Sequence, residues 1–80
     1  MPRYFLHLKD STDEILDPDG VEMPADALPA AALKSARDCI AGDVQDGRID
    51  LHYRIEIFDE LGTLVHRLPF SDAVEVVPTR

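Results

Sequence analysis

The sequence predicts an α+β fold in which a four-stranded antiparallel sheet carries one helix on one face. Residues 51–58 alternate apolar and polar side chains, the pattern of a strand with one face in the core and one in water. A turn at 59–62 and a second β-rich run at 63–70 complete a hairpin. Upstream, residues 26–46 repeat apolar side chains at intervals of three and four, which indicates a helix. Eighty residues provide room for a single domain, residues 1–80.

The first strand is expected at residues 3–9, where aromatic side chains fall on both faces. A strand of this kind is typical of the centre of a sheet. One face consists of Tyr4, Leu6 and Leu8, and the other of Phe5, His7 and Lys9.

The chain is then expected to fold back along this strand. The turn residues are Asp17-Pro18-Asp19-Gly20, in which proline presets φ and glycine relieves it at the end. Ile15-Leu16 and Val21–Met23 flank the turn as short pieces of a second strand, and Pro24 ends the second piece.

The helix has recognisable ends. Asp26 is the expected N-cap, and Pro29 is compatible with the first turn, where an N–H has no partner. Gly47 predicts a C-terminal end near Asp46. Gly42 weakens the helix by about 1 kcal/mol relative to alanine. The expected buried face consists of Ala32, Leu33, Ala36, Cys39, Ile40 and Val44.

The hairpin supplies the last two strands. The side chains expected in the core are Leu51, Tyr53, Ile55 and Ile57, followed by Leu64, His66, Leu68 and Phe70. Pro69 cannot donate to a neighbouring strand, so it predicts an edge position for 63–70. If the helix crosses over the first hairpin, the third strand lies beside the first and the spatial order is 2-1-3-4.

One helix covers one side of such a sheet, so the other side is predicted to stay open with two exposed phenylalanines. An open apolar face favours a homodimer. The expected protein-interface residues are Phe5, His7, His52, Arg54, Glu56 and Phe58.

The chain is acidic, with a formal net charge of −8. Seven acids and no base lie between Asp10 and Asp26. Such a surface repels phosphate backbones and disfavours direct nucleic-acid binding. It suits solubility, a basic protein partner or a weak divalent-cation site. An antitoxin-like or inhibitor protein that binds a basic partner through residues 10–26 is therefore the second functional hypothesis.

Composition favours a folded, cytoplasmic protein without a membrane segment. Apolar residues make up 45% and charged residues 30% of the chain, as in folded domains. Cys39 is the only cysteine, and a small domain without disulfides favours a reducing compartment. No apolar run approaches the roughly 20 residues that span a bilayer, and the N-terminus lacks a signal-peptide layout.

No catalytic set, cofactor or metal site is predicted, and the chain is interpreted as non-enzymatic. A third hypothesis is divalent-metal binding by His7, His52 and Glu56, but these residues lack the short spacing of a zinc site. The turn at 17–20 places glycine too early for a calcium loop. Cys39 lies beside the apolar stripe of the helix, where burial raises a thiol pKa and makes it a poor nucleophile.

Several blocks resemble a family of short bacterial proteins catalogued only as a domain of unknown function. These blocks are the opening 1–8, the segment 19–24, the helix residues 33–38 and the closing 68–74. The resemblance covers nearly the whole chain and implies a small α+β domain without assigned activity, cofactor or catalytic residues. The order of elements is also similar to small antitoxin domains of the HicB type, a likeness of architecture alone.

Overall fold

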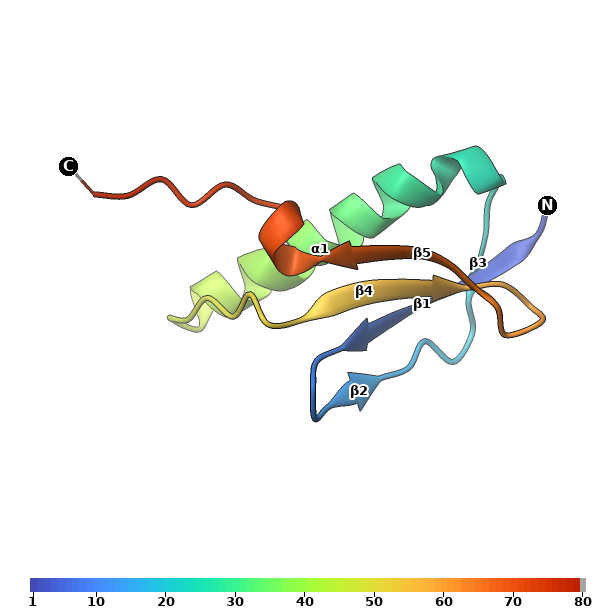
Figure 1. The fold of residues 1–80 in the computed structure, drawn as a ribbon, viewed down its shortest axis with the longest axis horizontal. Helices are drawn as coiled ribbons and strands as arrows, with labels where there is room; N and C mark the ends of the chain where they lie inside the picture. Colours follow the sequence, from blue (N-terminus) through green and yellow to red (C-terminus); the bar gives the residue numbers. More distant parts are fainter. Residues whose placement is uncertain (80) are drawn as a thin grey trace.

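The computed structural model describes residues 1–79 and confirms the predicted α+β class (Figure 1). The strands are β1 (Arg3–Lys9), β2 (Glu14–Ile15), β3 (Val21–Glu22), β4 (Arg54–Phe58) and β5 (Leu64–Pro69). The helix α1 (Leu28–Gln45) joins β3 to β4, and short 3₁₀ turns, η1 (Ala25–Ala27) and η2 (Phe70–Asp72), precede it and follow β5.

The sheet is antiparallel with the order β2-β1-β4-β5, which is the predicted arrangement with β1 in the interior. The predicted second strand consists of two separate pieces that pair with opposite ends of β1. β2 lies beside Leu8 and Lys9, whereas β3 lies beside Arg3 and Tyr4. The turn at 17–20 occupies the space between them.

The helix differs from its prediction at the N-terminus. Asp26 is not the cap: the chain first forms η1, and Ala27 occupies the N-cap position without a side-chain hydrogen bond. Pro29 falls in the first turn of α1, as predicted, where its fixed φ suits the start of a helix. At the other end Gly47 has φ +86°, the left-handed conformation that allows the chain to leave the helix.

The core lies between α1 and the β4–β5 hairpin. α1 packs against β4 and β5, and Figure 1 shows it crossing behind the sheet. Ala32, Ala36 and Ile57 are fully buried there, and Phe70 is 1% exposed. Leu6 and Leu8 of β1 pack only at the margin of this core and are half-buried. The helix therefore leaves the β1–β2 side of the covered face partly open.

Three further predictions about the elements are wrong in detail. Val44 is 50% exposed because the last turns of α1 extend past the start of β4 (Figure 1). The third strand begins at Arg54 rather than Leu51. An irregularity between Ile57 and Phe58 shifts the register of β5, so Leu64 lies opposite Phe58 and is 47% exposed instead of buried.

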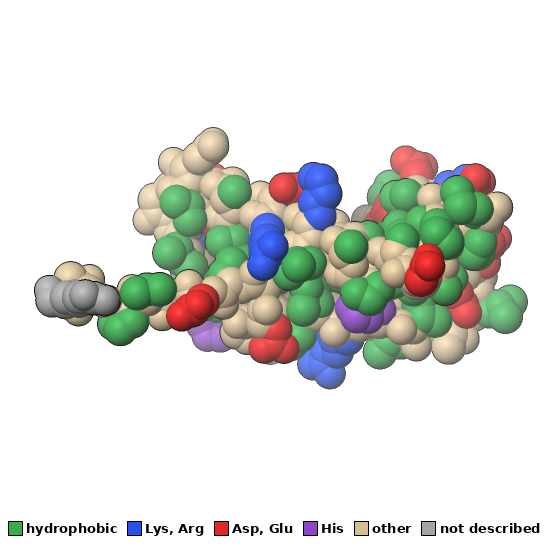
Figure 2. Space-filling view, turned by 90° about the horizontal axis from the view of Figure 1, so that it is seen from above, with side chains coloured by type: hydrophobic (Ala, Val, Ile, Leu, Met, Phe, Trp, Pro, Cys, Tyr) green, Lys and Arg blue, Asp and Glu red, His purple; other side chains and the backbone are tan. Residues whose placement is uncertain are grey.

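Residues 73–79, which follow η2, contain no helix or strand. Figure 2 shows them extending away from the body of the molecule, with apolar side chains along them. Val76 and Val77 are 67% and 72% exposed. Within residues 1–79, no helix combines the length and apolar character needed to cross a membrane.

Candidate functional site on the open sheet face

The face of the sheet opposite α1, called the open face below, gathers side chains from three strands. Alternation along β1 and β4 directs every second residue away from the core. Strand register places Phe5 opposite Phe58, His7 opposite Glu56 and Lys9 opposite Arg54. The open face therefore consists of Phe5, His7, Lys9, Arg54, Glu56, Phe58 and, from β5, Arg67 and Leu64.

Five of the six predicted interface residues lie on this face, and His52 does not. His52 precedes β4, and its side chain is 93% exposed. Both its backbone N–H and its ring Nδ1 lie near the Asp50 carboxylate, at 3.0 and 3.1 Å. Because Asp50 holds this segment in a local turn, the alternation predicted for residue 52 does not begin until Arg54.

At the centre of the open face, Glu56 is buried among three cations. Its residue exposure is 9%, although the sequence predicted a position on the open side of the sheet for it. Arg54 Nε donates to Glu56 Oε2 at 2.7 Å, and Lys9 Nζ lies 3.2 Å from Oε1. Arg67 Nε is 3.9 Å from Oε2. Burial of this carboxylate is tolerated because it is paired on both oxygens.

These contacts fix the charge state of Glu56. The hydrogen bond from Arg54 lowers its pKa, burial opposes that effect, and Lys9 adds a second lowering contact. The net result is a pKa below the ordinary value of 4.5. Glu56 is therefore an ionised structural anchor, and it lacks the raised pKa of a general acid.

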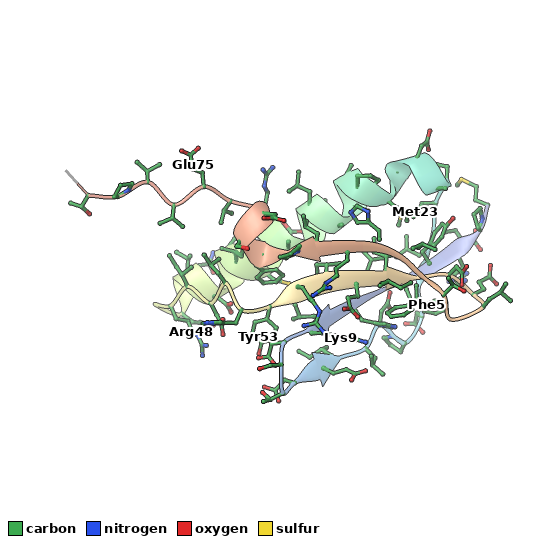
Figure 3. All side chains as sticks on the ribbon, viewed as in Figure 1. Phe5, Lys9, Met23, Arg48, Tyr53 and Glu75 are labelled. Atoms are coloured by element: carbon green, nitrogen blue, oxygen red, sulfur yellow. The ribbon has the colours of Figure 1, made fainter. Side chains whose placement is uncertain are left out.

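The two phenylalanines are less exposed than predicted, and each has a different cover. Lys9 Nζ lies 5.0 Å from the centroid of the Phe58 ring, and the His7 ring centroid lies 5.3 Å from it. Phe5 is covered by the turn at Gly20, where a Cβ atom would stand 2.9 Å from Phe5 Cε1. Both phenylalanines are half-buried within the single chain. Figure 3 labels Phe5 and Lys9, which both come from β1.

Asp17 and His7 attach the turn to the edge of β1. Asp17 Oδ2 accepts from the Leu6 N–H at 3.3 Å, and Oδ1 accepts from the N–H groups of Asp19 and Gly20 at 3.2 and 3.0 Å. The Asp17 N–H donates to His7 Nδ1 at 3.0 Å, so this nitrogen is unprotonated in the structure. The carboxylate thus satisfies a β1 donor in the gap between β2 and β3.

The pKa of Asp17 reflects this role. Partial burial acts to raise it, but hydrogen bonds from the backbone of Gly20, Leu6 and Asp19 outweigh burial and lower the pKa overall. The turn was correctly predicted from its residues, whereas its attachment to β1 was not.

A shallow hollow of about 430 Å³ opens beside these residues. Its floor is formed by Phe5, His7 and Phe58. One wall comes from Glu14 and Leu16, and the opposite wall from the β4–β5 turn at residues 59–62. Leu16 is 54% exposed and Leu61, at the tip of that turn, is 90% exposed. One exposed leucine, Leu16, therefore lines the hollow, and a second, Leu61, lies on the turn beside it.

The candidate chemical groups lie in different parts of the fold. Cys39 is half-buried on the other side of the sheet, and burial, reinforced by Asp43 and Asp38, raises its pKa. Among residues 1–79, no cluster of three or more histidine, cysteine, aspartate or glutamate side chains has the geometry to hold a metal ion. The proposed ligand set of His7, His52 and Glu56 is not brought together, and Glu56 is occupied by Arg54 and Lys9.

Sequence reasoning missed three contributors to the site: Lys9, Arg67 and Asp17. The alternation of β1 and β5 already placed Lys9 and Arg67 on the open side, so their positions were available from the pattern. Their attraction to Glu56 could not be predicted from the pattern, because it depends on strand register. The hydrogen bonds of Asp17 to β1 depend on the split of the second strand, for which the sequence has no clear signal.

Comparison with known proteins places the whole of this architecture in one family. No curated protein and no solved structure shows significant similarity to the chain. The family model described as Domain of unknown function (DUF6894) matches residues 3–71, which run from the start of β1 into η2. The match includes every strand, the helix and all the residues of the open face, and we conclude that the chain belongs to this family of unknown function.

Proposed function

We propose that the chain is a non-enzymatic protein-binding domain that self-associates through the open face. The observation that carries this proposal is the charge pattern of that face. Three of the eight Lys and Arg residues, Lys9, Arg54 and Arg67, surround a single buried carboxylate. The face is therefore basic at its centre, although the chain as a whole carries −8.

The rim of the same face has the opposite charge. Glu14, Asp59 and Glu60 line the hollow beside the basic centre. A two-fold interface brings the same patch of both subunits together, so a patch with a basic centre and an acidic rim can complement itself. The half-burial of Phe5 and Phe58 reduces the apolar area that a second copy covers, so charge contributes more than was expected from the sequence.

The apolar part of the proposed contact comes from the walls of the hollow. Leu61 is 90% exposed on the turn beside it, and Leu16 is 54% exposed on the opposite wall. In a two-fold pair, Leu61 of each copy is available to enter the hollow of the other. Burying such an exposed leucine contributes on the order of 2 kcal/mol.

Sedimentation velocity over a range of micromolar concentrations tests self-association. The expected result is an average mass that rises from monomer toward dimer and falls again as salt is added, because exposed charge pairs are screened over about 10 Å at 0.1 M. A mass that stays monomeric at every concentration would exclude the proposal.

Two matched substitutions locate the contact. Leu61→Gln removes an exposed apolar side chain from the turn beside the hollow and is expected to weaken association about tenfold or more. Ile49→Gln makes the same change at a residue that is 64% exposed beyond the C-terminus of α1, and it is expected to leave association unchanged. Equal effects of the two substitutions would place the contact elsewhere.

Binding of a basic protein partner is the second candidate function. The proposed location is a reducing compartment, where the Cys39 thiol persists. Part of the 10–26 segment remains available for such a partner, since Asp13, Asp19 and Asp26 are exposed. Other acids of this segment interact within the chain: Glu22 pairs with Arg3 at 3.0 Å, and Asp17 accepts a hydrogen bond from the Leu6 N–H. Copurification of a basic partner that is released by salt would favour this function over self-association.

A further inference from the structure

A groove runs along the helix side of the sheet, between α1 and the β1–β2 edge. It consists of two adjoining hollows of about 330 and 280 Å³ that share Leu8, Ile15 and Cys39. The groove exists because α1 lies over β4 and β5 and leaves the β1 side of the covered face without a second helix. We call it the helix–edge groove.

The floor and the helix wall of the groove differ in chemistry. Leu6 and Leu8 form the floor, and Ile15, which is 62% exposed, forms the strand wall. The helix wall carries Ser35, Cys39 and Asp43, which are spaced by four residues and so lie on one face of α1. An apolar floor is therefore bordered by polar and acidic groups.

The electrostatic potential of the groove is negative beside Cys39, which lines both hollows, and beside Tyr53, which lines the smaller one. Burial raises the pKa of Cys39, and the carboxylates of Asp43 and Asp38 raise it further. In the smaller hollow, partial burial raises the pKa of Tyr53, and the carboxylates of Asp10 and Asp13 raise it further. Figure 3 places Tyr53 near Arg48, the cation that borders the same hollow.

The nearby cations neutralise little of this charge. Arg48 Nη2 pairs with Asp50 at 3.1 Å, and Lys34 Nζ pairs with Asp38 at 2.6 Å. The Lys34 and Asp38 side chains are 77% and 66% exposed, where an ion pair is weak. Asp43, Asp10 and Asp13 therefore dominate the potential along the groove.

Apolar contact and charge together specify an occupant. A second copy of this chain would bring a net charge of −8 toward an acidic rim, which opposes binding. We propose that the helix–edge groove binds a segment of another protein in which apolar side chains are flanked by lysine or arginine. The inference gives the basic partner considered above a binding site, and it concerns the opposite side of the sheet from the proposed self-association.

Cys39 provides a site-specific readout because it is the only cysteine and lines both hollows. The full chain is mixed with a short synthetic peptide of leucine and lysine, and the rate of modification of Cys39 by a disulfide reagent is measured at fixed pH. At a peptide concentration about ten times the Kd, the rate is expected to fall about tenfold, since only the free protein reacts. A matched peptide of leucine and glutamate is expected to leave the rate unchanged.

Substitutions separate the groove from general attraction between a cationic peptide and an acidic protein. Ile15→Gln removes the strand wall, and Ile49→Gln makes the same change at an isoleucine of similar exposure, 64% against 62%. Asp43→Asn removes a charge from the helix wall, and Asp46→Asn removes one just beyond the end of α1. Protection is expressed as the ratio of rates without and with peptide, because Asp43 also influences the thiol itself.

The expected result is loss of protection in Ile15→Gln and Asp43→Asn and its retention in both controls. No protection by the leucine–lysine peptide, or equal protection in Ile15→Gln and Ile49→Gln, would overturn the inference. Protection that grows with protein concentration without any peptide would also overturn it, since the occupant would then be a second copy. None of these three outcomes bears on the open face, which Leu61→Gln tests separately.

Discussion

The two faces of this sheet are held by different interactions. The covered face is apolar, with Ile57 of β4 and Ala36 of α1 fully buried between the sheet and the helix. The open face has no helix, and its cover consists of charged side chains around Glu56 and of the turn that Asp17 attaches to β1. Hydrophobic burial needs no particular charge state, whereas paired charges respond to pH and salt. A sheet with one helix can therefore protect both faces, but only one of them with a conventional core.

The largest test of this difference compares neighbouring residues that point to opposite faces. Ile57→Ala is expected to lower the free energy of unfolding by about 2–5 kcal/mol, because its side chain is fully buried. Phe58→Ala removes a larger side chain but one that is half-buried, so its cost is expected to be smaller. Urea unfolding measures both, and Ile57→Val, with a cost of about 1 kcal/mol, serves if Ile57→Ala does not fold. Equal costs for Ile57→Ala and Phe58→Ala would contradict the distinction.

Glu56→Gln tests the charged centre of the open face. The substitution keeps the size of the side chain but removes the buried carboxylate that Arg54 and Lys9 share, so a cost of about 1–3 kcal/mol is expected at neutral pH. Since the folded-state pKa of Glu56 lies below 4.5, its contribution is full above pH 4.5 and is lost as the pH falls through the lowered value. The difference in unfolding free energy between wild type and variant should therefore shrink in acid. A difference that stays constant down to acid pH would show that Glu56 acts through packing alone.

Asp17→Ala addresses the turn that covers Phe5. It removes the acceptor for the N–H groups of Leu6, Asp19 and Gly20, and a cost of about 1 kcal/mol is expected. Amide hydrogen exchange should accelerate most at Leu6 and Gly20, where the turn meets β1. Asp19→Ala is the control, because Asp19 contributes its backbone carbonyl, at 2.7 Å from Arg3 Nη1, and the substitution preserves that group. Similar exchange rates in the two variants would show that the carboxylate of Asp17 does not hold the turn.

The same contrast between faces explains what the sequence could predict. Alternation in 3–9 and 51–58 identified the faces of both central strands, and the hairpin and the single helix sufficed for the order β2-β1-β4-β5. The five predicted interface residues that lie on the open face followed from that alternation. These features are local patterns or consequences of short connections, which a single sequence expresses directly.

The errors involve interactions between segments that are distant in sequence. The burial of Glu56 required knowing that Lys9 and Arg67 flank it on neighbouring strands. His52 was assigned to the open face because the pattern does not reveal where Asp50 interrupts the strand. The shift of Leu64 to the surface depends on a register irregularity that alternation cannot show. Pairing and register decide these positions, and neither is written in the order of apolar and polar residues.

The smallest expected effect concerns a residue that belongs to neither face. Gly42 lies in α1 with no atom within 4 Å of the position that a Cβ would occupy. Gly42→Ala is therefore expected to raise the unfolding free energy by about 0.5–1 kcal/mol, since alanine loses less conformational freedom in a helix. Thermal or urea unfolding gives the gain in stability, and sedimentation shows whether association changes.

A Gly42→Ala variant that is more stable and has an unchanged mass distribution provides a background for testing Leu61→Gln. In that background, a loss of association caused by Leu61→Gln reports the interface rather than the stability of the fold. A change in association caused by Gly42→Ala itself would instead show that α1 takes part in the contact.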